Sequence, residues 1–588
     1  MKRDKVSKGK ILYRYLVVLF FVFILFFRFS FISNGGAFAE PDELRYLQSI
    51  SAIENLFKGN LSNFCFNISS AHCRPGDVIR NLVPASIQYM ALKIFGLDPL
   101  NPDSLLIPLF FNVIISVFLS FFIFKISFLV FNKDYPLSLT ATIVYSILVN
   151  NNFYIRHLLP YDMSLLCFII AIFLIIERYK RHAEFNKRLL FGVGALSTFG
   201  FMVYPGYYFL FIFVFFLFII LSHRIKEISE FYQNLKIIAY QCFIYIIPFV
   251  LSIFLFDVLA HIGKTFSYTI TCLVISSTIT QGSYEESFIF LLKYLVDVEN
   301  VIGSIVLMGV VSYLICLILS FFFKRKNKFF NIFIENRLVV FLFISGVVGY
   351  LLHATLGYFG FFVFYGRILH QYLPFFVLGS VFFIHSLASM IKKRNVIMGV
   401  LIVISLFSFF SFYLDFKKVS YPRDVLYKMG FTLKNERIDY TSIEEDIQKN
   451  RLMTVIDFEN APLQYIVETP PHNCFMPPQK SPFKKDFHYK KKDYKFINFC
   501  FFYPIDKPAP KYNMLMNYYR KLKGKHEISL VPDAPQPFRA YIPEEGWETI
   551  FERPHFLLMK PYMYEGLSIE GRRLLKERAY KIKILKKK

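Results

Sequence analysis

The chain has 588 residues, of which 55% are hydrophobic, and its 74 Phe contrast with a single Trp. This composition excludes an ordinary soluble protein and predicts a polytopic membrane protein. The net charge of +25 would also suit nucleic-acid binding, but the basic residues fall mostly in short loops between apolar runs and in the tail. Membrane orientation and anionic lipid explain such a distribution better.

The first apolar run, residues 13–32, is long enough to cross a bilayer, because about 20 apolar residues fill the hydrocarbon core. Several Lys and Arg precede it, as in a signal peptide. The run is too long for that alternative, and Ala37-Phe-Ala39 only loosely imitates a cleavage site. We therefore predict an uncleaved anchor with a cytoplasmic N-terminus, broken at the far surface by Asn34-Gly-Gly36.

Residues 34–104 form a polar first outer loop, which we expect to lie along the membrane surface and to begin as a helix. Its apolar residues recur at helical spacing: Leu44, Leu47, Ile50, Ile53 and Phe57.

Ten further apolar runs follow, the short ones being marginal in length for a span. They are residues 105–131, 137–149, 163–176, 189–203, 207–221, 237–256, 301–323, 338–356, 372–391 and 396–414. With the anchor, the sequence predicts about 11 spans.

Loop charges give an independent test, because Lys and Arg accumulate in short cytoplasmic loops. The predicted cytoplasmic loops are residues 132–136, 177–188, 222–236, 324–336 and 392–395, and four of these five are strongly basic. An odd number of spans places residues 415–588 outside. The predicted fold is therefore mostly α, with a transmembrane domain over residues 1–414 and an extracytoplasmic α/β domain over residues 415–588.

Cysteines occur as two pairs in segments predicted to lie outside. Cys65 and Cys73 lie in the first outer loop, and Cys474 and Cys500 lie in the tail. This placement predicts two disulfides in an oxidising compartment, with four unpaired thiols as the alternative. Zinc fits less well, because neither pair has Cys-x-x-Cys spacing.

Carboxylates gather in the outer connections. Asp42 and Glu43 follow the anchor, and Asp162 stands at the start of a later span after Pro160. Carboxylates at the interface between lipid headgroups and water are suited to chemistry on a substrate that is partly embedded in the bilayer. The alternative for Asp162 is a helix N-cap, which accepts a backbone N–H.

Cations and aromatic residues on the same predicted side are candidates for holding a phosphate. Arg367 and His370 are one helical turn apart, and a guanidinium holds phosphate through two parallel hydrogen bonds. The alternative for Arg367 is snorkelling to lipid headgroups. The further candidates are Tyr365, Arg156 and Lys264. No motif for a nucleotide or a serine-hydrolase site is present in the sequence.

The order of these features resembles the C-type (GT-C) superfamily of membrane glycosyltransferases, whose relatives include aminoarabinose lipid A transferases and protein O-mannosyltransferases. The resemblance covers residues 13–414 and depends on Pro41-Asp-Glu43, on Arg156 and Asp162 before a span, and on Arg367 followed by Tyr372 and Pro374. An outward C-terminal domain completes the pattern.

The resemblance implies an inverting transfer of a sugar from a polyprenyl phosphate carrier to a hydroxyl of a cell-envelope glycan, lipid or protein. The site would face the periplasm or exterior of the inner (plasma) membrane. Asp42 would be the base, Glu43 would orient the acceptor or support Asp42, and Asp162 would hold hydroxyls. The phosphate would be held by Arg367, assisted by Lys264, Arg156, His370 and Tyr365.

One departure from the wider superfamily concerns metal. Relatives that glycosylate an amide nitrogen use a divalent ion and carry Trp-Trp-Asp in the tail domain, whereas the one Trp here is Trp547 in Gly546-Trp-Glu548. We therefore expect no required cofactor, although Asp42 and Asp162 could share a divalent metal. The rival functions are a transporter or flippase of a lipid-linked substrate, a surface-polysaccharide polymerase or ligase, and a pseudo-enzyme that binds an outer partner.

Overall fold

The structure is a computed structural model of the whole chain. It describes residues 2–33, 43, 45–69, 74–96, 102–223, 235–279, 287–323, 328–361 and 366–416, together with six strands in the segment that follows.

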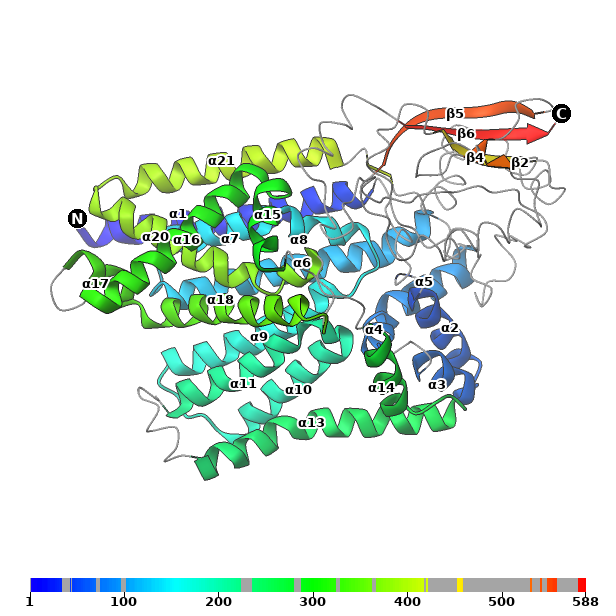
Figure 1. Ribbon diagram of the computed structural model, residues 1–588, viewed down its shortest axis with the longest axis horizontal. Coiled ribbons are helices and arrows are strands. Elements are labelled where there is room, and N and C mark those ends of the chain that lie inside the picture. Colours follow the sequence, from blue (N-terminus) through cyan, green and yellow to red (C-terminus); the bar gives the residue numbers. More distant parts are fainter. Residues whose placement is uncertain are drawn as a thin grey trace.

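The chain begins with the long helix α1 (Lys2–Ile32) and continues into four helices of the first outer loop. These first-loop helices are α2 (Arg45–Phe57), α3 (Leu61–Ser69), α4 (Pro75–Arg80) and α5 (Leu82–Phe95). The helical start predicted for this loop is confirmed, with Leu47, Ile50 and Ile53 buried. Figure 1 shows the first-loop helices grouped at the end of the molecule away from the N-terminus.

The rest of the helical part is a bundle whose long members run roughly alongside α1 (Figure 1). Its first half comprises α6 (Pro102–Val130), α7 (Tyr135–Ile147), α8 (Val149–Phe153), η2 (Tyr154–Arg156), α9 (Tyr161–Lys180), α10 (Lys187–Val203), η3 (Pro205–Tyr207), α11 (Tyr208–His223) and α13 (Leu235–Ile262). Its second half comprises α14 (Tyr268–Ile279), α15 (Ser287–Asp297), α16 (Asn300–Phe323), α17 (Lys328–Glu335), α18 (Arg337–Tyr358), α19 (Gly366–Leu369), α20 (Leu373–Met390) and α21 (Arg394–Phe416).

Each predicted apolar run lies almost entirely within one helix, although α1 begins well before its run and α13 continues to Ile262. In the part of the chain that the structure describes, eight helices are long and apolar enough to cross a membrane: α1, α6, α11, α13, α16, α18, α20 and α21. The other three runs form α7, α9 and α10. Two are short, with 13 residues in α7 and 17 in α10, while α9 carries Asp162 near its start and Glu177, Arg178 and Lys180 near its end. The chain thus has multi-pass membrane architecture, and 11 spans remain a prediction.

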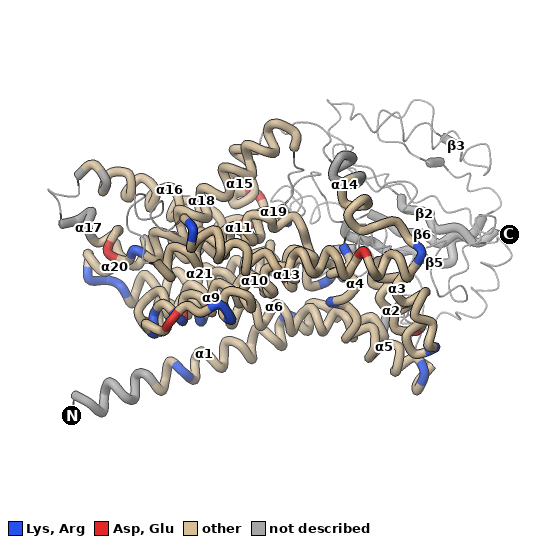
Figure 2. The backbone as a smooth tube through the Cα atoms, turned by 90° about the horizontal axis from the view of Figure 1, so that it is seen from below, with Lys and Arg blue, Asp and Glu red and all other residues tan. Residues whose placement is uncertain are grey.

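Predicted cytoplasmic loops meet at one end of the bundle. The Lys180 Nζ donates to Asn132 Oδ1 at 2.9 Å, and Arg394 forms an ion pair with Asp134. Asn336 Nδ2 donates to the Val130 carbonyl at 2.7 Å. Figure 2 shows Lys and Arg at this end, near α17 and α20. Four of the five predicted cytoplasmic loops thus contact one another at one end of the bundle, while most of the loop over residues 222–236 lies outside the described residues. The membrane side that this end adopts remains a prediction.

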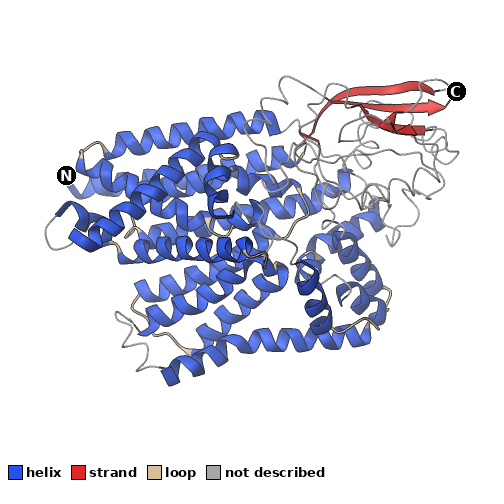
Figure 3. Ribbon diagram, in the orientation of Figure 1, coloured by secondary structure: helices blue, strands red, loops and turns tan. Residues whose placement is uncertain are grey.

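The residues described after Phe416 are all in strands (Figure 3). They are β1 (Val419–Ser420), β2 (Leu452–Asp457), β3 (Ser529–Leu530), β4 (Ala540–Tyr541), β5 (Trp547–Leu557) and β6 (Tyr580–Lys587). One sheet has the order β1-β5-β6-β2, with β1 parallel to β5 and the other pairs antiparallel, while β3 and β4 form an antiparallel pair. An α/β domain in this segment remains a prediction.

Candidate active site

Asp162 lies in the first turn of α9, but it is not the residue that caps this helix. The N-cap position belongs to Pro160, so the N-cap interpretation of Asp162 is wrong. Its carboxylate instead approaches His370, with Asp162 Oδ1 2.9 Å from His370 Nε2. Both side chains are buried. The two atoms are in contact but are not aligned as in a good hydrogen bond, so the attraction between them is mainly electrostatic.

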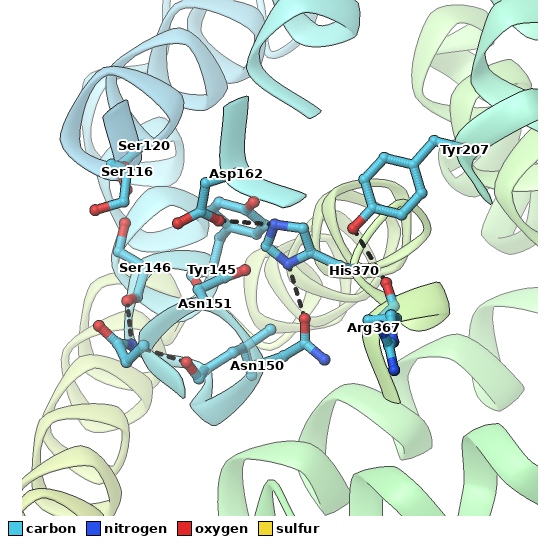
Figure 4. A network of polar contacts seen from close by, with 12 residues as sticks. Ser116, Ser120, Tyr145, Ser146, Asn150, Asn151, Asp162, Tyr207, Arg367 and His370 are labelled. Atoms are coloured by element: carbon cyan, nitrogen blue, oxygen red, sulfur yellow. Dashed lines mark hydrogen bonds and ion pairs between the residues drawn. The ribbon is translucent and has the colours of Figure 1, made fainter. Parts of the chain in front are cut away.

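His370 is held on its other side by Asn150, at the start of α8. Asn150 Oδ1 lies 2.7 Å from His370 Nδ1, and Figure 4 shows the imidazole between Asp162 and Asn150. The Asn150 amide nitrogen donates to the Gly366 carbonyl at 3.0 Å and to the Tyr294 hydroxyl at 2.9 Å. Both ring nitrogens of His370 therefore face protein groups.

Glu299 fixes the backbone that carries Asn150. Its buried carboxylate accepts the backbone N–H groups of Asn150, at 2.9 Å, and of Val149. N–H groups in the first turn of a helix have no partner within the helix, and a negative charge is favoured at this end. Glu299 lies directly before α16, where Gly303 packs so closely on it that an added Cβ would clash with Leu295 and Glu299. A glycine is therefore required at residue 303.

Arg367 lies on the other side of this cluster, in α19. Its guanidinium carbon is 5.3 Å from the centroid of the Tyr161 ring, and its Nη1 donates to the Tyr161 hydroxyl. The Arg367 carbonyl accepts a hydrogen bond from the Tyr207 hydroxyl at 3.1 Å (Figure 4). This half-buried guanidinium thus rests on the residue that precedes Asp162, which argues against a purely lipid-facing, snorkelling side chain.

Glu43 joins the first outer loop to the connection that precedes α9. Its carboxylate accepts the backbone N–H of Leu158 and lies 3.4 Å from His157 Nδ1. Asn112 Nδ2 in turn donates to the His157 carbonyl at 2.6 Å. Because Glu43 and His157 are fully buried, this contact ties the segment that contains the predicted base to the segment that contains Asp162.

A buried ion pair continues this connection into the first-loop helices. Arg80 Nε lies 2.9 Å from Asp77 Oδ1, and Arg80 Nη1 donates to Asn112 Oδ1 at 3.5 Å. Asn112 therefore links the pair to His157. Asp77 and Arg80 are about as buried as Glu43.

A buried cation, Arg28, lies inside α1. It donates to Asn152 Oδ1 at 3.1 Å and to Ser116 Oγ and the Ser146 carbonyl, both at 3.0 Å. Arg28 and Asp162 also attract each other electrostatically. An ionisable residue within a span is a functional signal in itself, and its position in the first apolar run could have revealed it from sequence.

The remaining predicted residues have different surroundings. Arg156 is fully buried, with its guanidinium carbon 5.3 Å from the Phe31 ring centroid.

Lys264 is exposed, just after α13. It follows Gly263, which packs against Cys65 and Phe66 of α3. Lys264 therefore lies beside α3 of the first outer loop, where the Ile262 carbonyl accepts a hydrogen bond from Ser62. Asp42 and Tyr365 lie outside the described residues.

Cys65 is a free cysteine in the structure, so the predicted disulfide at this residue is not formed there. Its thiol is buried, and burial raises the pKa of Cys65. Cys73, Cys474 and Cys500 lie outside the described residues. Over the described ranges, no three His, Cys, Asp or Glu side chains are grouped to hold a metal.

Sequence reasoning missed several residues of this site. Asn150, His157 and Tyr161 belong to the connection that drew attention to Asp162, but they carry no spacing signal of their own. Glu299 could have been found as an acid one turn before Gly303, at the start of a predicted span.

No protein-family model, curated protein or solved structure matches the chain. The functional assignment therefore depends on the residues and contacts described above.

Proposed function

We propose that this chain is an inverting membrane glycosyltransferase, which moves a sugar from a polyprenyl phosphate donor to a hydroxyl of an envelope glycan, lipid or protein. The observation that supports it most directly is the cluster of Asp162, His370 and Arg367 at the bundle end away from the basic loops. Asp162 and Lys180 bound the same helix, whose 20 residues correspond to about 30 Å, one hydrocarbon thickness. If α9 spans the membrane, the carboxylate of Asp162 and the guanidinium of Arg367, which contacts the adjacent Tyr161, would lie near the same membrane surface.

The guanidinium suits the leaving group of such a transfer. When the bond between the anomeric carbon and the phosphate oxygen breaks, its electron pair stays on the phosphate. Phosphate needs no acid to leave, but its charge must be stabilised, and Arg367 can do this through charge-assisted hydrogen bonds. Both ring nitrogens of His370 already face Asp162 and Asn150, so Arg367 is assigned the main phosphate contact.

The carboxylates suit the acceptor and the sugar. As the acceptor oxygen bonds to the anomeric carbon, its proton passes to a base, to which we assign Asp42. Asp162 would hold hydroxyls and favour the oxocarbenium-like charge of the sugar. Glu43 would act mainly by fixing the connection before α9, since its carboxylate holds the Leu158 N–H. Single displacement inverts the anomeric centre.

Topology and location belong to the same proposal. The chain would cross the inner (plasma) membrane 11 times with a cytoplasmic N-terminus, and the site and an α/β domain over residues 415–588 would face the periplasm or exterior. No cofactor would be required, and a divalent metal shared with Asp42 stays an alternative.

A transporter or flippase of a lipid-linked substrate is the second candidate, because Arg28 is a buried charge inside a span. Purified protein in liposomes distinguishes the two. A transferase converts labelled polyprenyl phosphate sugar to glycosylated acceptor in detergent, where no membrane separates two compartments. Protein that moves the lipid across liposomes but never transfers its sugar would support the transporter.

The Arg367→Ala variant is expected to raise the KM for the lipid-linked donor by about 10- to 100-fold. The reason is the loss of charge-assisted hydrogen bonds worth about 1.5–3 kcal/mol, where about 1.4 kcal/mol is tenfold. Initial rates of transfer at varied donor concentration measure the effect. The matched control is Arg181→Ala, since Arg181 is exposed at the other end of the bundle and forms only a surface pair with Glu177. Equal effects in both variants would contradict the phosphate-binding role.

A further inference from the structure

The amide of Asn150 has only one orientation that its neighbours allow. The Gly366 carbonyl accepts hydrogen bonds and cannot donate, so the Asn150 atom 3.0 Å from it must be the NH2 group. The carbonyl oxygen of the same amide then faces His370 Nδ1 at 2.7 Å. An oxygen that only accepts requires a donor opposite, so Nδ1 of His370 carries a proton.

The other ring nitrogen then determines the charge of the pair. His370 Nε2 faces Asp162 Oδ1 at 2.9 Å, and two lone pairs at that distance would repel each other. The pair therefore holds one further proton, either on the imidazole, as an imidazolium beside a carboxylate, or on the carboxyl group. In both cases the pair holds one proton in excess of a neutral imidazole and a carboxylate, and its net charge is zero.

We propose that Asp162 and His370 form a one-proton dyad, and that Glu299 and Asn150 are the positioning residues that fix its histidine. Glu299 holds the Asn150 backbone through the N–H groups of α8, Asn150 holds Nδ1, and His370 holds one oxygen of Asp162. Figure 4 shows the second oxygen of Asp162 turned away from His370. The dyad keeps this second oxygen in place as an acceptor for a sugar hydroxyl. This use of the dyad rests on the proposed glycosyl transfer.

Charged and titratable groups from several elements surround the dyad. Arg28 of α1, Tyr145 of α7 and Tyr207 of η3 all interact electrostatically with Asp162. Tyr154 of η2 lies with its ring centroid 6.1 Å from that of His370, and Tyr294 contacts Asn150. Arg367 reaches the cluster through Tyr161, which is next to Asp162. The two cations Arg28 and Arg367 exceed the single negative charge of Glu299 by one, so a neutral dyad among them leaves a net positive charge close to the proposed phosphate site.

Nitrogen NMR of the full chain in lipid nanodiscs, labelled with 15N-histidine, tests the dyad without any sugar substrate. The His370 signals are assigned by their loss in His370→Gln. We expect the wild-type spectrum to show a protonated Nδ1, and an Nε2 shifted from the value of a free imidazole by the further proton that the pair holds. A wild-type His370 with an unprotonated Nδ1 would overturn the dyad, whether or not any variant folds.

The Glu299→Gln variant tests the positioning role. A glutamine offers one acceptor oxygen where the carboxylate accepts two backbone N–H groups, so Asn150 should move and the His370 Nδ1 signal should shift. In the transfer assay, kcat should fall about tenfold, equivalent to about 1.4 kcal/mol, while the donor KM stays unchanged. Glu184→Gln, at an exposed loop residue, is the control that changes neither readout.

The two readouts separate the dyad from the proposed function. Glu299→Gln protein with an unaltered His370 spectrum would overturn the positioning role. Normal dyad signals in wild-type protein that transfers no sugar would leave the dyad standing and would instead overturn the glycosyl transfer.

Discussion

The Asp42→Asn and Asp162→Asn variants should each lose most of the transfer activity, for different reasons. Asparagine at residue 42 removes the proposed base, and loss of general base catalysis costs about 10²- to 10⁴-fold in kcat. Asparagine at residue 162 removes the carboxyl group that pairs with His370 and whose second oxygen is the proposed acceptor for a sugar hydroxyl, a loss of about 10²- to 10³-fold by analogy with other preorganised electrostatic groups. Single-turnover rates at saturating donor measure both.

Double substitution and a surface control sharpen this prediction. If Asp162 and His370 act as a unit, Asp162→Asn combined with His370→Gln should be hardly slower than Asp162→Asn alone. The control is Glu184→Gln, which removes an exposed carboxylate at the opposite end of the bundle. Folded Asp42→Asn protein with the full transfer rate would remove Asp42 from its assigned role, and fully additive losses would argue against a coupled pair.

Hydrophobic run length predicted the helices well, because a span must satisfy its backbone internally and needs a fixed length of apolar residues. The periodicity of Leu47, Ile50 and Ile53 likewise predicted α2, since a helix that packs on one side buries one face. Both signals are local. Three runs do not form long, uncharged helices: α7 and α10 are short, and α9 carries charged residues at its ends. These helices are packed within the bundle, where contact with neighbouring helices takes the place of contact with lipid.

The partners of the site residues were not predictable in the same way. His370 and Asn150 are separated by 220 positions, and Glu299 and Asn150 by 149. No residue spacing encodes such contacts, because they depend on how whole helices pack. Residue type alone identified Asp162 and Arg367 as candidates. It also suggested a helix N-cap for Asp162, which is wrong, and it did not identify Glu299 as the residue that holds the Asn150 backbone. Cys65 shows the same limit, since its position after the anchor suggested a disulfide, yet the structure leaves it as a free thiol.

The Asp77→Asn variant should destabilise the protein by about 3–5 kcal/mol, because it leaves the buried Arg80 cation without its counter-charge. Arg80 Nη2 and Asp77 Oδ2 are buried without hydrogen-bond partners, so the intact pair already lacks some of its hydrogen bonds. The loss of folding free energy in Asp77→Asn should therefore fall near the lower end of this range, at about 3 kcal/mol. Equilibrium unfolding of the purified protein in a fixed detergent, with SDS as denaturant, measures the free energy of unfolding.

The exposed pair of Glu54 and Lys58 provides the matched comparison for this buried pair. Their atoms approach to 2.6 Å, closer than the 2.9 Å of Asp77 and Arg80, yet Glu54→Gln should cost less than about 1 kcal/mol, because water screens an exposed pair. Replacing both buried partners, as Asp77→Asn with Arg80→Met, should recover part of the lost stability, because it removes the uncompensated charge.

The buried pair also supports the connection before α9. Arg80 contacts Asn112, and Asn112 donates to the carbonyl of His157, so Asp77→Asn should also loosen the contact between Glu43 and this connection. Equal small losses from the buried and the exposed pair would mean that water reaches Arg80 and that the first-loop helices do not hold this connection.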